Sequence, residues 1–120
     1  MSLDVLNPVN VETRIRDISA RIANSASVCN DRYTAFLAAD RAYDQAFAKA
    51  YMGHEGPAHE KKYAAELATE TERTDRDATD AAYKYADRLA KALESELRAY
   101  QSIGASVRAM YGVAGRGEGS

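Results

Sequence analysis

Several residue types that fix structure or chemistry are scarce in this chain. It has one cysteine, two prolines, no tryptophan and only seven glycines in 120 residues. The single Cys29 excludes an intrachain disulfide and fits a reducing compartment. Proline and glycine, the residues that interrupt helices, lie mainly near the middle and the ends of the chain. Long helices are therefore expected.

The chain also lacks a long apolar run and a large surplus of either charge. No stretch approaches the roughly 18 apolar residues of a membrane span, and the first residues lack the basic region and apolar run of a signal peptide. We therefore expect a cytoplasmic protein that makes no membrane contact. The 16 basic and 18 acidic side chains give a formal charge of -2. Strong non-specific DNA binding usually shows a basic excess, so this balance argues against it.

The first half of the chain has the spacing of one long amphipathic helix. Asn7-Pro8 predicts its start, with asparagine at the N-cap and proline at the first helical position. The pattern predicts a helix over 8–52. A break near Asn24–Ser27 is the alternative, because poor helix formers gather there and Asn30-Asp31 offers a new N-cap. Apolar or amphipathic residues recur every seven positions, namely Ile15, Ile22, Cys29, Phe36, Tyr43 and Ala50.

Two glycines and a proline at 53–57 interrupt this pattern. We expect a glycine in the left-handed conformation to close the first helix and Pro57 to start the next. Apolar positions spaced three or four apart then predict a helix over 58–111. The Gly-rich residues 112–120 predict a flexible tail. The expected organisation is one helical domain over 1–111, followed by this tail.

The middle of the second helix carries an acidic segment. Glu55–Asp80 holds eight acidic against four basic residues, and no large apolar residue lies within 69–77. A solvated helix face is the favoured interpretation, and an acidic docking surface for a basic partner is the alternative.

The two halves match as an antiparallel helical hairpin. Facing apolar positions have residue numbers that add to 114 or 115: Tyr51 and Tyr63, Phe47 and Leu67, Tyr43 and Thr71, Phe36 and Ala78, Tyr33 and Ala82, Cys29 and Tyr85, Ile22 and Leu93, Ile18 and Leu97, Ile15 and Tyr100. A hairpin alone leaves much of the surface of each helix exposed to solvent. We therefore predict an all-α homo-oligomer, most simply a dimer that forms a four-helix bundle. The alternative is that a partner protein covers the helix surface that the hairpin leaves exposed.

Residues with catalytic or ligating chemistry do not form a recognisable constellation. His54 and His59 are one position too far apart for the zinc-protease pattern, and Pro57 lies between them, so we interpret them as exposed turn residues. Cys29 lies in the apolar row and is expected to be buried and inert. We predict no catalytic, cofactor-binding or metal-binding residue and no cofactor.

The tyrosines and the C-terminal arginines suggest a weak binding surface. Tyrosines at 43, 51, 63, 85 and 100 fall on the predicted seam. Arg98, Arg108 and Arg116, together with Tyr111, make the end of the second helix locally basic. Such residues can stack and neutralise single-stranded nucleic acid. A cationic helix end favoured by the helix dipole is the preferred interpretation.

Two motifs resemble known families. LESELRAYQSIGASVRAMY at 93–111 and AYDQAFAKAY at 42–51 resemble small helical proteins of actinobacterial phages. This resemblance implies a non-enzymatic accessory protein that acts on host or phage proteins of DNA metabolism or defence. Tyr51-Met52-Gly53 is similar to the Trp-x-Gly tip of WXG-type helical hairpins. The export signal of that family has a counterpart only inside the second helix, at Tyr83 and Asp87.

These observations favour a non-enzymatic protein-protein interaction module. The alternative is an accessory nucleic-acid-binding protein of a phage recombination or replication system. That function would use Arg98, Arg108, Tyr111 and Arg116.

Overall fold

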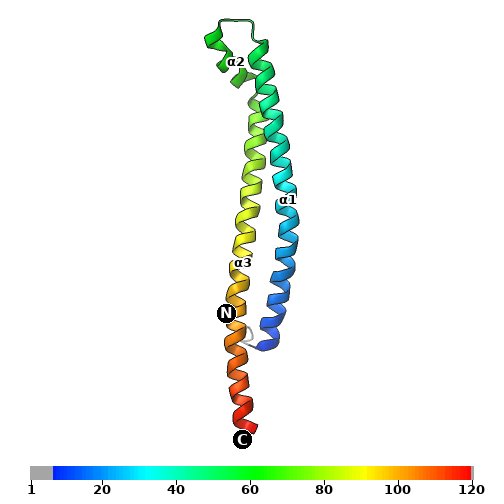
Figure 1. Ribbon diagram of the computed structural model, residues 1–120, viewed down its shortest axis with the longest axis vertical. Helices are drawn as coiled ribbons and strands as arrows, with labels where there is room; N and C mark the ends of the chain where they lie inside the picture. The colour runs from blue at the N-terminus through cyan, green and yellow to red at the C-terminus, as the bar shows by residue number, and fades with distance from the viewer. Residues whose placement is uncertain (1–6, 120) are drawn as a thin grey trace. The chain divides into compact units, whose positions relative to one another are not determined.

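The computed structural model describes residues 7–119, and it describes side chains as far as Gly112. Its elements in chain order are α1 (Pro8–Gly53), the 3-10 helix η2 (Ala58–Glu60), α2 (Lys61–Ala68) and α3 (Glu70–Gly119) (Figure 1). The described part of the chain contains no strand. The predicted all-α fold is therefore confirmed.

The helices contribute to two packing units. Unit 1 comprises Met1–Ala26 and Arg88–Ser120, and unit 2 comprises Ser27–Asp87. Both α1 and α3 pass from one unit into the other. The side-chain chemistry of each unit is described separately below.

The helix α1 begins at the predicted residue. The Val9 backbone N–H donates to Asn7 Oδ1 at 2.9 Å, and the Val11 N–H donates to the Asn7 carbonyl at 3.0 Å. Asn7 thus satisfies N–H groups that a helix start leaves without intrahelical partners. The helix runs without interruption through Asn24–Ser27, where the Ser25 hydroxyl donates to the Ile22 carbonyl at 2.7 Å. The alternative of a break in this segment is not what the structure shows.

The turn after α1 forms without left-handed backbone. No described glycine has a positive φ, so the expectation for Gly53 and Gly56 was wrong. Pro57, with φ -55° and ψ 144°, lies immediately before η2, and its carbonyl accepts the Glu60 N–H at 3.0 Å. The fixed φ of proline therefore sets the entry into the next helical segment.

The predicted continuous helix over 58–111 is interrupted at Thr69. This residue has φ -114° and ψ 23°, and its hydroxyl donates to the Ala65 carbonyl at 2.7 Å. The same kind of hydroxyl bond forms at Thr13 and Thr74 inside uninterrupted helices, so the bond accompanies the interruption and does not by itself cause it. The β-branched side chain has poor helix propensity, and the backbone torsion angles of Thr69 leave the helical region. The result is a separate α2 in place of one uninterrupted helix.

The other end of the predicted second helix differs as well. α3 continues to Gly119, eight residues beyond the predicted end at Tyr111. Extending a formed helix costs far less than nucleating one, so a long helix can continue into glycine-containing sequence. The predicted flexible tail over 112–120 is therefore helical backbone as far as Gly119.

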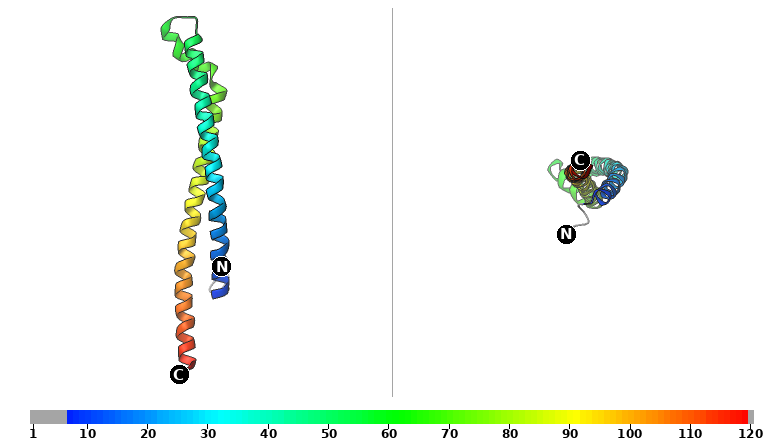
Figure 2. Two further views of the ribbon diagram at one scale, coloured as in Figure 1. Left: turned by 45° about the vertical axis from the view of Figure 1, so that its right-hand side comes forward. Right: turned by 90° about the horizontal axis from the view of Figure 1, so that it is seen from below.

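In unit 1, the first part of α1 runs antiparallel beside the later part of α3, as the blue and orange ribbons of Figures 1 and 2 show. The unit buries four aliphatic side chains, namely Val11, Ile18, Leu93 and Val107. Gly104 permits a close approach: a Cβ atom built on it would lie 3.2 Å from Val11 Cγ1. The numbers of Val11 and Gly104 add to 115, which is the predicted register.

In unit 2, the later part of α1 lies beside the first part of α3, and α2 and η2 follow the turn. Arg32 Nη1 donates to the Ala82 carbonyl at 3.1 Å, and the rings of Tyr33 and Tyr83 lie 5.0 Å apart between centroids. The buried side chains are small or polar: Ala65, Thr69 and Ala86. Unit 2 therefore has little aliphatic core.

Several seam residues predicted for unit 2 lie outside its core. Tyr63, Leu67 and Tyr85 are exposed, so the expected buried pairs of Tyr51 with Tyr63 and Phe47 with Leu67 are wrong. The break at Thr69 removes α2 from the register of α3, which explains the first two cases. Tyr83 replaces Tyr85 as the tyrosine that contacts α1. Cys29 is half-buried, whereas the sequence predicted full burial.

Candidate interaction surface

Two strongly exposed apolar side chains of unit 2 lie on α2. Tyr63 and Leu67, one helical turn apart, are 65% and 78% exposed. On the same short helix, Ala65 is fully buried, and Thr69 directly after it is buried as well. Packing of the small residues toward the protein turns the large apolar residues toward solvent. We call Tyr63 and Leu67 the α2 patch.

A row of aromatic rings leads along α1 to the same end of unit 2. Ring centroids are 6.0 Å apart for Tyr43 and Phe47 and 6.2 Å apart for Phe47 and Tyr51. The Lys61 ammonium lies 5.9 Å from the Tyr51 ring centroid, so it links the start of α2 to the end of α1. The ring contacts lie within α1, and the contact of Lys61 with Tyr51 joins α2 to this row. Met52, next to Tyr51, is exposed.

Exposed apolar residues continue along both units. Unit 2 adds Tyr33, Leu37 and Tyr85, and unit 1 exposes Val9, Leu89, Met110 and Tyr111. Isolated exposed apolar residues are normal on a protein surface. Here they recur along the described helices while few apolar side chains are buried.

The units differ in charge. Unit 2 carries twelve acidic and eight basic residues, a net charge of -4. The described residues of unit 1 comprise eight basic and five acidic residues, a net charge of +3. The acidic segment recognised in the sequence therefore belongs to an acidic unit. Because the basic residues are divided evenly between the units, the difference in net charge comes from the acidic residues.

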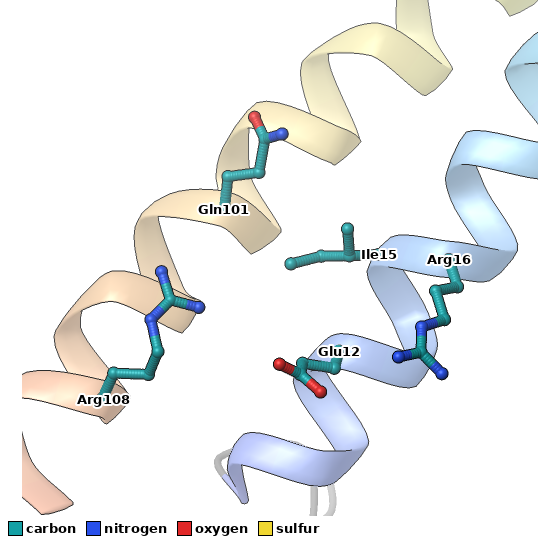
Figure 3. A pocket seen from close by; sticks show the side chains of 5 residues that line it. All are labelled: Glu12, Ile15, Arg16, Gln101 and Arg108. Carbon is teal, nitrogen blue, oxygen red and sulfur yellow. The ribbon is translucent and has the colours of Figure 1, made fainter.

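A hollow of about 320 Å³ lies in unit 1. Figure 3 shows its lining: Ile15 points from α1 toward α3, and the Glu12 carboxylate and the Arg108 guanidinium both face the gap. Gln101 lies on α3, and Arg16 projects along the side of α1. All four polar side chains are exposed. The hollow is an open depression lined by charged and polar side chains, with Ile15 as its apolar wall.

The structure brings only part of the predicted basic site together. Arg108 and Tyr111 are exposed and lie one turn apart on α3. Arg98 lies about 140° around the helix from Tyr111, and its guanidinium donates to the Ser95 hydroxyl at 3.2 Å. The side chain of Arg116 lies outside the described side chains. Nucleic-acid binding by these four residues stays a prediction.

The turn histidines also lie apart from any cluster of ligands. His54 Nε2 lies 3.4 Å from Glu60 Oε2, and His59 is exposed. Within the described residues, no three histidine, cysteine, aspartate or glutamate side chains gather closely enough to hold a metal ion. In the same part of the chain, no helix combines the length and apolar character needed to cross a membrane.

Three structurally important residues were not recognised from the sequence. Val11 lies before the apolar row that starts at Ile15, although its spacing to Ile15 and Ile18 continues the row. Thr69 lies at the start of the segment without large apolar residues, which was a usable signal for an interruption. Gly104 is the only glycine within 58–111. A glycine inside a helix destabilises it, which often indicates close packing.

Comparison with known proteins adds no relative. No family model matches the chain, and neither a curated protein nor a solved structure matches it significantly. The resemblances to phage helical proteins and to WXG-type hairpins therefore stay predictions.

Proposed function

We propose that this protein is a non-enzymatic interaction module that associates with a second copy of itself through its helical faces. One observation carries the proposal. Eleven large apolar side chains are exposed on the described residues, whereas six apolar side chains are buried, two of which are alanines. Pairing with further helices would remove this surface from water.

The geometry within each unit supports helical association. A pair of antiparallel helices can bury only one stripe of each helix, and the opposite faces stay in water. Two such pairs form a four-helix bundle when they pack through their remaining apolar faces. Burial contributes about 25 cal/mol for each Å² of apolar surface removed from water, so several exposed tyrosines and leucines supply a substantial driving force.

Sedimentation equilibrium over a range of protein concentrations tests the proposal. We expect the apparent mass to rise toward twice that of one chain at micromolar concentration. The double variant Tyr63→Glu, Leu67→Glu should weaken this association, because it places charges on the α2 patch. Lys62→Glu, which changes an exposed polar residue on the same helix, serves as the control.

A mass of one chain at every concentration, with full helicity by circular dichroism, would contradict self-association. An unchanged dissociation constant for the α2 variant would remove the α2 patch from the interface. The control variant separates loss of apolar contact from a general effect of negative charge on α2.

A further inference from the structure

The unequal charges of the two units indicate how a second copy is oriented. Unit 2 is acidic, with a net charge of -4, and the described part of unit 1 is basic, with a net charge of +3. Two copies aligned in parallel would place like charges against each other in both units, which costs free energy. Two antiparallel copies place opposite charges together in both units.

We infer that the protein forms an antiparallel twofold dimer, in which unit 1 of each copy packs on unit 2 of the other. This inference rests on the proposed self-association and adds its orientation. The twofold arrangement satisfies both units of both copies and closes the assembly. A single head-to-tail contact would leave one unit of each copy open and allow chains of copies to grow.

Apolar residues available in the two units fit the same arrangement. Unit 2 presents Met52 and the α2 patch where the chain turns after α1. Unit 1 presents Val9 in the first turn of α1, and Met110 and Tyr111 on α3. Each unit therefore offers large apolar side chains as well as one sign of charge. Contact between unlike units combines apolar burial with electrostatic attraction.

Cysteine cross-linking tests the orientation directly. In a Cys29→Ser background, Lys62→Cys places a thiol on exposed α2 in unit 2, and Ala109→Cys places one on exposed α3 in unit 1. After the two proteins are mixed and oxidised, the inference predicts disulfides between the unlike variants. Mass spectrometry distinguishes these from like pairs. The background protein without an added cysteine is the blank.

Charge reversal provides an independent readout. Arg14→Glu, Arg21→Glu and Arg98→Glu together change the described charge of unit 1 from +3 to -3. Asp31→Lys, Asp44→Lys and Asp75→Lys together change unit 2 from -4 to +2. All six side chains are exposed.

Each triple variant should raise the dimer dissociation constant about tenfold at about 50 mM salt, and less at higher salt because ions screen exposed charges. The combined six-residue variant should recover to within about threefold of the natural protein, since both units then attract again. Arg14→Lys, Arg21→Lys and Arg98→Lys together preserve charge and serve as the matched control.

The outcomes separate the inference from the proposed function. Cross-links between like variants, or no rescue by the six-residue variant, would overturn the antiparallel orientation while self-association stands. A monomer in sedimentation, with no cross-link of either kind, would overturn both.

Discussion

The two units hold their helices together with different chemistry. Unit 1 buries four aliphatic side chains and brings α3 onto Val11 at Gly104, where there is no side chain to keep the helices apart. Unit 2 buries only alanines and Thr69, and joins its helices through rings and cations such as Arg76, whose guanidinium lies 4.3 Å from the Tyr43 ring centroid. Stability in unit 1 therefore depends on apolar burial, and in unit 2 on partly exposed contacts.

This difference indicates which unit has more apolar surface available for contact with a partner. Most of the exposed large apolar side chains belong to unit 2, although it buries the smaller ones. Partly exposed ring and cation contacts are each worth less than a fully buried aliphatic side chain. Unit 2 is thus expected to gain more from a partner than unit 1. The following substitutions test this contrast by folding stability, measured by urea unfolding at one fixed protein concentration.

The largest effect is expected in the aliphatic core of unit 1. Leu93→Ala removes a side chain that is 4% exposed and should lower the free energy of unfolding by about 2–5 kcal/mol, from lost burial and the cavity left behind. Leu89→Ala, one turn away and 43% exposed, is the matched control and should cost about 1 kcal/mol or less. Equal losses from the two leucines would show that burial does not distinguish them.

The close approach at Gly104 should give the next largest effect. Gly104→Leu forces a side chain into contact with Val11 and Ile15 and should cost about 1–3 kcal/mol by overpacking. Gly112→Leu is the matched control, because a Cβ atom there meets nothing within 4 Å. If the two leucine variants are equally stable, the close approach does not hold unit 1 together.

A substitution at the helix interruption in unit 2 should lower the free energy of unfolding by less than the substitutions in unit 1. Thr69→Val keeps the shape of the side chain but removes the 2.7 Å hydrogen bond to the Ala65 carbonyl, at a cost of about 1 kcal/mol. Thr74→Val removes a similar bond to the Glu70 carbonyl, 2.9 Å long, at an exposed position. Its effect should be smaller. A Thr74 variant as destabilised as the Thr69 variant would argue against a special role for the buried hydroxyl.

The helical architecture could be predicted from the sequence because it depends on periodic hydrophobic patterns and on local chemistry at the helix ends. The spacing of Ile15, Ile18 and Ile22 indicated the buried face of α1, and Asn7-Pro8 indicated its start. The predicted antiparallel register is found at Val11 and Gly104. This register could be predicted because it depends on where the chain reverses, and the glycines and proline at 53–57 indicate that place. The interruption at Thr69 was not predicted because it lies in the backbone torsion angles of a single residue, which a hydrophobic pattern does not specify.

The candidate surface was harder to predict than the helices. Sequence spacing placed Tyr63 and Leu67 on the seam, because it assumed one uninterrupted helix after the turn. Once Thr69 separates α2 from α3, the same residues face solvent and become surface for a partner. The acidic segment was visible in the composition. That it belongs to a unit with a net negative charge, whereas the other unit has a net positive charge, could be learned only from which residues pack together.

The smallest expected effect tests the cation-ring contact of unit 2. Arg76→Gln removes the guanidinium above the Tyr43 ring and should cost about 0.5–1 kcal/mol, as expected for a partly exposed cation-ring pair. Tyr43→Leu and the double variant complete a double-mutant cycle, which isolates the coupling between the two side chains from their separate contacts. Arg41→Gln, an exposed arginine on α1, serves as the control for loss of charge. A coupling energy near zero would mean that the pair does not help hold α1 and α3 together in unit 2.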